Sequence, residues 1–574
     1  MSRLTILLLA LLLAAPATQA AKTAPARSSP ADREEVRGDS LVTRVQKALG
    51  EAGLYLGPAT GVMDKATEEA IRAFQKRSGM KGEPKVTEQL ALQIESSHKI
   101  QALLGRLEEV RGKAIEAARS ALMSREETRR LLESPPDETA DPARDPKPCF
   151  RSPTPACLLE EAAETAKTIP ADDLRDWARG ELLVAQAKAG LIPQAMDTAR
   201  RVHDPRLILV ALRDIAEGQA EAGLTGEAAA AAEAIPDASK RIEALAAIAE
   251  IEAKRGLSEG ARASAQRLLA LLPEVEDTIK RVALRTRAAV VLRRAGDAAG
   301  GDAALKDAEA EARREKDGAA RGAALRHIAQ ALAELRRVGP ATALLDDIPA
   351  DVDRTPVLMA LTVHHAKAGE FDRARALAQR IPEARYRTVA LAQVAAELGA
   401  AGHVEETLDL LEKAKELSKD ITLPFARDYA AGQMVAAWSR LGGRRFADAR
   451  DTHTFDRTLD AVARIADDRL RAHMLWTVAA DRRRAGDAAG AKATEDKARD
   501  GTIEVRSALT RVWLHGDIAL ERSTDGEKEA AIAAFRRGLE EAEPLDNAWS
   551  RTRALAKLAA TLNDLQRAGI SVGR

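Results

Sequence analysis

The side chains that could carry chemistry are few and scattered along this sequence. The adjacent pair His364 and His365 lies in a helical pattern, where neighbouring side chains point about 100° apart and cannot easily chelate one metal together. Four further histidines occur singly in or beside helical segments, where we interpret them as packing or surface residues: His327, His403, His473 and His515. The sequence contains no HExxH zinc motif and no Walker phosphate loop. We therefore expect no catalytic residue, no cofactor and no metal site.

The first 20 residues have the pattern of a secretory signal peptide, which we place at 1–20. Arg3 precedes an apolar run from Leu4 to Ala15, which is shorter than the roughly 20 residues that span a bilayer. Small residues then precede a cleavage site after Ala20. We expect export to a bacterial periplasm, or secretion, with no membrane span after cleavage. An uncleaved anchor is the alternative.

The only two cysteines, Cys149 and Cys157, lie together in a proline-rich stretch. An exported protein meets oxidising conditions, so we interpret the pair as a local disulfide. Two free thiols are the alternative. A metal site is disfavoured because no histidine is near and two thiolates make half a zinc site.

The composition indicates an all-α protein. Lys plus Arg and Asp plus Glu each number 88, so the formal net charge is zero. Nucleic-acid binding needs a basic excess on some face, and we therefore expect no nucleic-acid partner. Aromatic residues make up only 3% of the chain, which argues against strands. Alanine is abundant and has the highest helix propensity.

Changes in composition divide the chain into segments. Residues 21–39 are polar and proline-containing, which predicts a disordered spacer. Residues 98–133 carry apolar side chains at helical spacing and form a predicted helical connector. Residues 134–157 contain seven prolines, which predicts a semi-rigid linker. The folded regions are then 40–97 and 158–574.

Residues 40–97 contain three predicted helices. Ser40 can cap the first helix, the second runs from about Lys65 to Ser78, and Thr87 can cap a short third one. We interpret four apolar residues as the core of the bundle: Leu49, Ile71, Phe74 and Leu90.

Several motifs in this region resemble the peptidoglycan-binding type 1 domain. They are Val45-Gln46-x-x-Leu49-x-x-x-Gly53-Leu54-Tyr55-x-Gly57, Thr60-Gly61-Val62-Met63, Thr67-x-x-Ala70-Ile71-x-x-Phe74-Gln75-x-x-x-Gly79 and Thr87-x-x-Leu90. The resemblance implies a small helical domain that binds the glycan–peptide mesh of the cell wall and performs no chemistry. The family usually has Asp-Gly where this chain has Thr60-Gly61, and an aromatic residue before Gly where it has Met63-Asp64.

Four residues of this domain are candidates for peptidoglycan contact. Met63 and Asp64 lie in the loop that departs from the family pattern. We expect Tyr55 to expose a ring that could stack on a sugar, although it could instead pack the turn. Gln75 is a candidate that we expect to hydrogen-bond the loop backbone.

Residues 158–574 repeat a pattern of two helices joined at a glycine. The marker glycines are separated by 30–44 residues: Gly190, Gly223, Gly256, Gly296, Gly339, Gly369, Gly402, Gly442, Gly486 and Gly526. Such a period predicts stacked helical hairpins. A small residue recurs five positions after seven of these glycines: Ala195, Ala228, Ala261, Ala374, Ala447, Ala491 and Ala531.

This spacing resembles tetratricopeptide repeats, and Gly369 to Ala374 is the most similar piece. The predicted fold class is all-α, a small three-helix peptidoglycan-binding-like bundle followed by a long α-solenoid of helical hairpins. We expect the last helix, from Ser550 to Leu565, to cap the stack. Because repeats contact mainly their neighbours, deleting Leu224 through Gly256 should leave a folded protein.

The function we predict is an exported, cell-wall-associated scaffold with a protein or peptide partner on the solenoid. One alternative is a peptidoglycan-processing enzyme. Glu95-Ser96 resembles the catalytic start of lytic transglycosylases, but the Gly-Leu-Met-Gln segment of that family is absent. The other alternative is a polysaccharide-binding solenoid, which low aromatic content disfavours.

Overall fold

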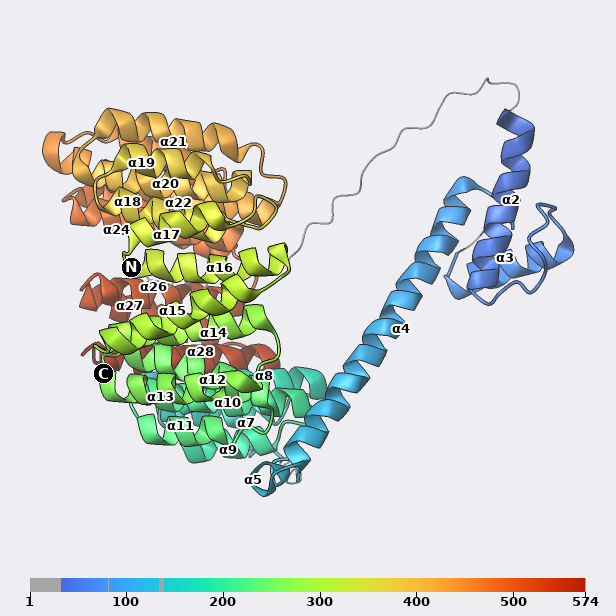
Figure 1. The fold of residues 1–574 in the computed structure, drawn as a ribbon, viewed down its shortest axis with the longest axis horizontal. Coiled ribbons are helices and arrows are strands. Elements are labelled where there is room, and N and C mark those ends of the chain that lie inside the picture. The colour runs from blue at the N-terminus through green and yellow to red at the C-terminus, as the bar shows by residue number, and fades with distance from the viewer. Residues whose placement is uncertain (1–32, 81, 134–138, 573–574) are drawn as a thin grey trace. The chain divides into compact units, whose positions relative to one another are not determined.

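The computed structural model describes residues 33–80, 82–133 and 139–572 of this chain (Figure 1). The described residues form helices, turns and loops, with no strand among them. The chain divides into two compact units, Met1–Ala118 and Arg119–Arg574, which we call the bundle unit and the ring unit. The predicted signal peptide lies outside the described residues. Within them, no helix is both long enough and apolar enough to cross a membrane.

The bundle unit contains three helices, α2 (Arg33–Glu51), α3 (Lys65–Arg77) and most of α4 (Glu88–Met123). The predicted core is found, since Leu49, Ile71, Phe74 and Leu90 are all buried. Arg44 on α2 donates to Glu88 and Glu95 on α4, with N–O distances of 2.5 Å to each. These bonds connect the first and third helices at their surface.

Two helix boundaries in the bundle unit differ from the prediction. The first helix begins at Arg33 and not at Ser40, so residues 33–39 of the predicted spacer are helical. The predicted short third helix and the predicted connector are one continuous helix, α4. No proline or glycine between Glu88 and Leu104 interrupts its hydrogen-bond ladder.

The proline-rich segment holds helices where we predicted a linker. After the short α5 (Glu126–Arg129), the chain forms α6 (Lys147–Arg151) and α7 (Pro155–Ala166). Proline is tolerated in the first turn of a helix, where the missing N–H has no partner to lose. Cys149 and Cys157 are joined by a disulfide with a Cα–Cα distance of 5.7 Å, and this bond ties α6 to α7.

The ring unit is built from pairs of antiparallel helices in two layers. The outer layer consists of α7 and ten further helices: α9 (Ile192–Arg200), α11 (Thr225–Glu233), α13 (Ser258–Leu271), α15 (Ala298–Arg314), α17 (Val338–Asp347), α19 (Phe371–Gln379), α21 (Val404–Ser418), α23 (His453–Val462), α25 (Ala488–Glu504) and α27 (Lys528–Ala542). A single 3₁₀ turn, Leu272–Glu274, follows α13.

The inner layer consists of the even-numbered helices: α8 (Asp172–Lys188), α10 (Pro205–Ala222), α12 (Ala238–Lys254), α14 (Thr278–Arg294), α16 (Gly318–Glu334), α18 (Thr355–Lys367), α20 (Ala384–Ala401), α22 (Pro424–Ala449), α24 (Asp468–Arg484), α26 (Ala508–Thr524) and α28 (Ala548–Arg567). Each packs on the even-numbered helices before and after it, whereas successive outer helices barely meet. Helices on the concave side of a curved array lie closer together than those on the convex side, so the even-numbered helices form the inner side.

The wall closes on itself. The last helix, α28, packs along α7 as every other inner helix packs along its outer partner, and it also packs on α8 (Figure 1). The described residues of this unit therefore form eleven helix pairs in a closed circuit. We predicted that the last helix would cap an open stack, and this was wrong because its second face is covered by the first helices of the same chain.

A group of aromatic and charged residues closes the circuit between α8, α26 and α28. The buried Arg553 of α28 donates to Glu181 of α8 at 2.7 and 2.9 Å. Its guanidinium lies 4.3–5.1 Å from the rings of three tryptophans, Trp177, Trp513 and Trp549. We call these five residues the clasp. Three of the chain's five tryptophans lie here, so tryptophan is concentrated at the closure.

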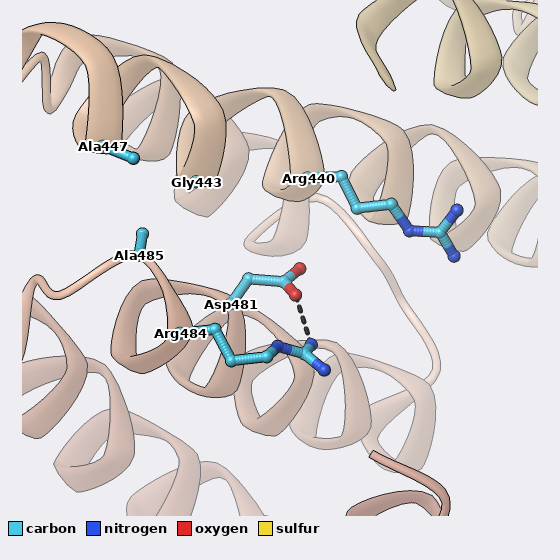
Figure 2. Close-up of a pocket in the computed structure, with 6 residues that line it drawn as sticks. All are labelled: Arg440, Gly443, Ala447, Asp481, Arg484 and Ala485. Carbon is cyan, nitrogen blue, oxygen red and sulfur yellow. Dashed lines mark hydrogen bonds and ion pairs between the residues drawn. The ribbon is translucent and has the colours of Figure 1, made fainter. Parts of the chain in front are cut away.

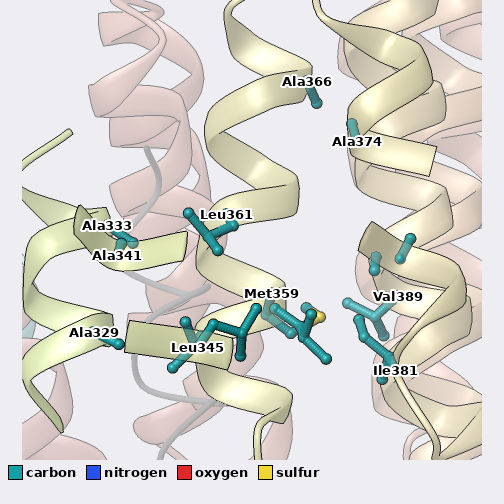
Figure 3. Close-up of a cluster of buried hydrophobic side chains, with 14 of the residues drawn as sticks. Ala329, Ala333, Ala341, Leu345, Met359, Leu361, Ala366, Ala374, Ile381 and Val389 are labelled. Atoms are coloured by element: carbon teal, nitrogen blue, oxygen red, sulfur yellow. The ribbon is translucent and has the colours of Figure 1, made fainter. Parts of the chain in front are cut away.

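The core of the ring unit is a layer of Leu, Ile, Val and Ala between the two helix layers. Figure 3 shows one stretch, where Leu345 of α17 and Leu361 of α18 lie beside small residues such as Ala329 and Ala341. Alanine at these positions lets the helix axes approach closely, and the larger side chains fill the remaining space.

Eight of the ten marker glycines occupy the predicted turns, with φ between 75° and 94°. The other two assignments are wrong. Gly339 lies in α17 and Gly442 lies in α22, while the turns next to them use Arg336 (φ 61°) and Arg450 (φ 55°). Counting from the ten true turn residues, the fifth position is buried in all ten cases, for example Ala341 after Arg336. Ala447, counted from Gly442, is exposed.

Replacing Arg336 by glycine is expected to stabilise the ring unit by about 1 kcal/mol. A left-handed backbone costs a residue with a Cβ roughly 1–3 kcal/mol, and glycine avoids most of that cost. The control is Arg336→Ala, which removes the same side chain but keeps the strained backbone. Urea unfolding of both variants measures the effect. Equal stability of Arg336→Gly and Arg336→Ala would contradict this explanation.

An arginine near the start of the inner helix recurs in ten of the eleven inner helices of the ring unit, all except α10. Its guanidinium donates to the backbone carbonyl six residues earlier, at the end of the preceding outer helix. Ten arginines make this bond: Arg175, Arg241, Arg281, Arg321, Arg354, Arg387, Arg427, Arg471, Arg511 and Arg551. The bond satisfies a carbonyl that the helix end leaves unpaired. It links the end of an outer helix to the start of the inner helix that follows.

Candidate functional site

The loop between α2 and α3 is held in place by one buried side chain, Gln46. Its amide oxygen accepts from Gly61 N at 2.9 Å, and its amide nitrogen donates to Val62 O and Thr67 Oγ1 at 2.9 Å each. Both ends of the amide are therefore satisfied by the loop and by α3. We found Gln46 in the family motif but did not assign it a role. The structure shows that it fixes the backbone from which the neighbouring side chains project.

Tyr55 is part of the core and not an exposed platform, so our expectation of an exposed ring was wrong. Only 6% of its surface is exposed, and its hydroxyl donates to Pro58 O at 3.2 Å. A Cβ on Gly57 would lie 2.7 Å from the Tyr55 ring, which explains why glycine is needed there. The alternative that Tyr55 packs the turn is the one the structure supports.

Asp64 and Gln75 both have structural partners. Asp64 is the N-cap of α3, and its carboxylate accepts from Thr67 Oγ1 at 2.6 Å and from Thr67 N at 2.7 Å. The bond from the Thr67 hydroxyl is the largest of the effects that lower the pKa of Asp64, so this carboxyl stays ionised. Gln75 donates to Glu83 O at 3.2 Å and so fixes the loop after α3.

Apolar side chains project from the α2–α3 loop into solvent. Leu56 is 99% exposed, Val62 is 62% exposed and Met63 is 36% exposed. Exposed side chains of this type can contact the apolar faces of sugar rings and the methyl groups of peptides. Of the four predicted contact residues, Met63 is therefore the one that the structure leaves most available. Leu56 and Val62 were not predicted from the sequence. Loop residues follow no helical or strand repeat, so the sequence pattern does not show which of them are exposed.

Substitutions at Tyr55 separate the two interpretations of this residue. Tyr55→Ala is expected to destabilise the bundle unit by about 3–5 kcal/mol, the usual cost of truncating a buried aromatic ring. Tyr55→Phe should cost only about 0.5–1.5 kcal/mol, because it loses a hydrogen bond and keeps the ring. Thermal unfolding followed by circular dichroism measures both. A Tyr55→Ala variant that melts like the wild type would mean that the ring does not support the loop.

Glu95 does not have the environment of a catalytic acid. Arg44 donates to it with two bonds of 2.5 and 2.9 Å, and the Arg44 hydrogen bonds are the largest cause that lowers the pKa of Glu95. A general acid in glycan cleavage needs a carboxyl whose pKa is raised. The geometry therefore assigns Glu95 a structural role in joining α2 to α4.

The ring unit has a pocket of about 440 Å³ between the inner helices α22 and α24 (Figure 2). It is lined by Arg440, Gly443 and Ala447 from α22, by Asp481 and Arg484 from α24, and by Ala485, which follows α24 directly. The small residues leave the space open. Arg484 donates to Asp481 at 2.5 Å, and its guanidinium also lies 2.7 Å from Asp525. The lining of the pocket therefore carries charges of both signs.

Three of the singly placed histidines, His327, His473 and His515, have shifted pKa values. Burial lowers the pKa of His327 and of His515 to about 4, so both are neutral at ordinary pH. Burial acts in the same direction on His473, but Glu521, 2.9 Å from its Nε2, outweighs it and raises the pKa. Among the residues that the structure describes, no group of three His, Cys, Asp or Glu side chains is placed to hold a metal ion.

Comparison with known proteins identifies one family. Residues 38–89 match the family described as "Putative peptidoglycan binding domain". A search of curated proteins gives no match. Among solved structures, the chain is similar to the crystal structure of Ton1535 from Thermococcus onnurineus NA1, with 15% identity over 58% of this chain and 97% of that chain. The TM-score of 0.26 is too low to support any argument about the ring unit.

Proposed function

We propose that this chain is a cell-wall-associated scaffold, in which the bundle unit binds peptidoglycan and the ring unit binds a protein or peptide partner. The observation that carries the proposal is the match of residues 38–89 to a peptidoglycan-binding family. That match supports binding to the cell wall. The loop that Gln46 fixes supplies the exposed side chains for it, above all Val62 and Met63.

The partner role of the ring unit is supported by the form of its inner layer. Eleven parallel helices present their faces to one side within the described residues, and such arrays bind extended ligands in other repeat proteins. The pocket at Arg440 and Asp481 offers charges of both signs, which matches a peptide backbone and its side chains.

A periplasmic location is part of the proposal. The signal-peptide pattern at residues 1–20 supports it. So does the disulfide between Cys149 and Cys157, because disulfides persist in oxidising compartments.

The two alternatives gain less support. A peptidoglycan-processing enzyme would need a general acid with a raised pKa. The hydrogen bonds from Arg44 instead lower the pKa of Glu95. A polysaccharide-binding solenoid would need exposed rings along its inner layer. Three of the five tryptophans instead surround Arg553 in the clasp, and of these Trp177 alone is more than half exposed.

Co-sedimentation of the full chain with insoluble peptidoglycan tests wall binding. The double variant Val62→Gln with Met63→Gln should bind about tenfold more weakly, corresponding to roughly 1.4 kcal/mol. The reason is that both apolar contacts are lost while the Gln46 bonds to the loop backbone remain. The matched control is Leu92→Gln, which removes a half-exposed apolar residue of α4 outside the loop.

Leu92→Gln should sediment like the wild type. A wild-type chain that stays in the supernatant at every salt concentration would refute the wall-binding proposal. Equal loss in the Leu92→Gln control would show that the α2–α3 loop is not the contact surface.

A further inference from the structure

The middle of α4 presents an apolar face to solvent. Five large side chains share it, and each leaves more than half of its surface exposed: Ile100, Leu103, Leu104, Leu107 and Val110. Earlier in the same helix, Leu90 and Ile94 are buried in the bundle core. A contiguous exposed apolar face on a soluble helix marks an interaction site, because isolated apolar residues would not recur at helical spacing.

The spacing of these residues is that of a helix-pairing seam. Ile100, Leu103, Leu107 and Val110 alternate at intervals of three and four, as residues do at the interface of a two-stranded coiled coil. A helix that lies on a membrane usually places Trp or Phe on its apolar face, and this face has neither. Arg111 borders this face, four residues after Leu107.

The edges of the face are basic. Lys99, Arg106 and Lys113 follow one another at seven-residue intervals along one edge, and Arg111 lies toward the other. Lys113 forms an ion pair of 2.6 Å with Glu109 of its own helix. No ion pair of Arg106 or Arg111 is found in the described part of the chain. Both guanidiniums are therefore available to an acidic partner.

These charges disfavour a second copy of this chain. In a parallel pair of identical helices, the edge residue of one heptad faces the opposite edge of the next heptad, which sets Arg106 of one copy against Arg111 of the other. In an antiparallel pair, the edge that contains Lys99 and Arg106 faces itself. Both arrangements bring like charges together.

We propose that this face of α4 binds an amphipathic helix of another protein, whose apolar stripe is bordered by Asp or Glu. The apolar residues of the two helices would cover one another, and the acidic edges would pair with Arg106 and Arg111. The proposal is independent of wall binding, because the α2–α3 loop lies on a different part of the bundle unit from residues 99–113.

The probe is a synthetic peptide of three heptads with Ile and Leu at the seam and Glu at both edges. A second peptide has the same seam and Lys at both edges. The full-length protein should bind the Glu-edged peptide at least tenfold more tightly, measured by fluorescence anisotropy at low salt. Leu103→Gln with Leu107→Gln should weaken that binding at least tenfold. Ile503→Gln, which changes an exposed apolar residue of α25, is the matched control and should have no effect.

Reversing the charges of Arg106 and Arg111 gives a variant that is expected to gain binding to one of the two peptides. Arg106→Glu with Arg111→Glu should invert the preference, so that the Lys-edged peptide binds more tightly than the Glu-edged one. Circular dichroism verifies that α4 remains helical in each variant.

Three results would overturn the proposal. The first is wild-type protein that binds neither peptide or both equally. The second is a dimer in sedimentation velocity that Leu103→Gln with Leu107→Gln abolishes, which would assign the face to a second copy. The third is stronger binding to phosphatidylglycerol vesicles that the same double variant abolishes, which would assign it to a lipid surface.

Discussion

Truncation of the chain after Asn547, which removes α28, is expected to unfold the closing region at both ends of the ring unit. Four leucines of this helix are fully buried: Leu555, Leu558, Leu562 and Leu565. Burial of each contributes about 1.5–3 kcal/mol, so together they approach the whole stability of a typical domain, about 5–15 kcal/mol. The truncation also leaves Glu181 without Arg553 and uncovers α7.

Hydrogen exchange followed by mass spectrometry measures this effect where it is most informative. In the truncated chain, amides of α7 and α8 should exchange much faster, although these helices are hundreds of residues from the cut. The control adds the missing helix back as a synthetic peptide of residues 548–567, which should restore protection in α7. Unchanged exchange in α7 after truncation would mean that the circuit is open in solution.

Deletion of one helix pair in register is expected to break the closure and leave the remaining pairs helical. Removing Leu224 through Gly256 joins Gly223 to Leu257, which has nearly the same backbone angles as Leu224. In an open solenoid this change would be nearly silent, as we expected from the sequence. In a closed circuit each of eleven pairs supplies roughly one eleventh of the turn, so ten pairs cannot meet without strain.

The deletion variant should therefore lose the contacts of Arg553 with Glu181 and with the tryptophans. The measurement combines far-ultraviolet circular dichroism, which should keep most of its helical signal, with tryptophan fluorescence, which should report exposure of the clasp rings. Arg553→Ala in the full-length chain is the matched control for the fluorescence change. A deletion variant with native fluorescence would show that the pairs adjust their angles freely.

The helix pairs were predictable because their turns depend on local chemistry. A glycine with positive φ is readable in a sequence, and eight of the ten assignments were confirmed. Arg336 and Arg450 were missed because no sequence rule distinguishes an arginine that adopts this conformation. From the sequence, we placed these two turns at Gly339 and Gly442, which both lie inside helices.

The repeated arginine is a signal that was readable and overlooked. Arg387 follows Ile381 by six residues, and the same interval separates Arg241 from Ile235. The repeat of this interval predicts that the arginine hydrogen-bonds the isoleucine carbonyl, which the end of the outer helix leaves without a helical partner.

Closure of the ring and burial of Tyr55 could not be predicted in the same way. Closure depends on the sum of small rotations between successive pairs, and each rotation is set by side-chain packing that no single residue reveals. Tyr55 lies in a turn, where neither a period of 2 nor one of 3.6 distinguishes an inward from an outward ring. The exposed apolar residues of the loop were only partly predicted for the same reason.

The pairing of α28 with α7 also determines the order in which this chain can finish folding. The hydroxyl of Thr552 donates to the carbonyl of Ala162, which lies 390 residues earlier in the sequence. The apolar side of α7 therefore stays uncovered until α28 has been synthesised. Intermediate pairs can form as they emerge, because their partners are adjacent. The final step has a high contact order and is expected to be slow. Until it occurs, α7 needs protection from other chains, and any binding function of the closed inner layer begins only with the final helix.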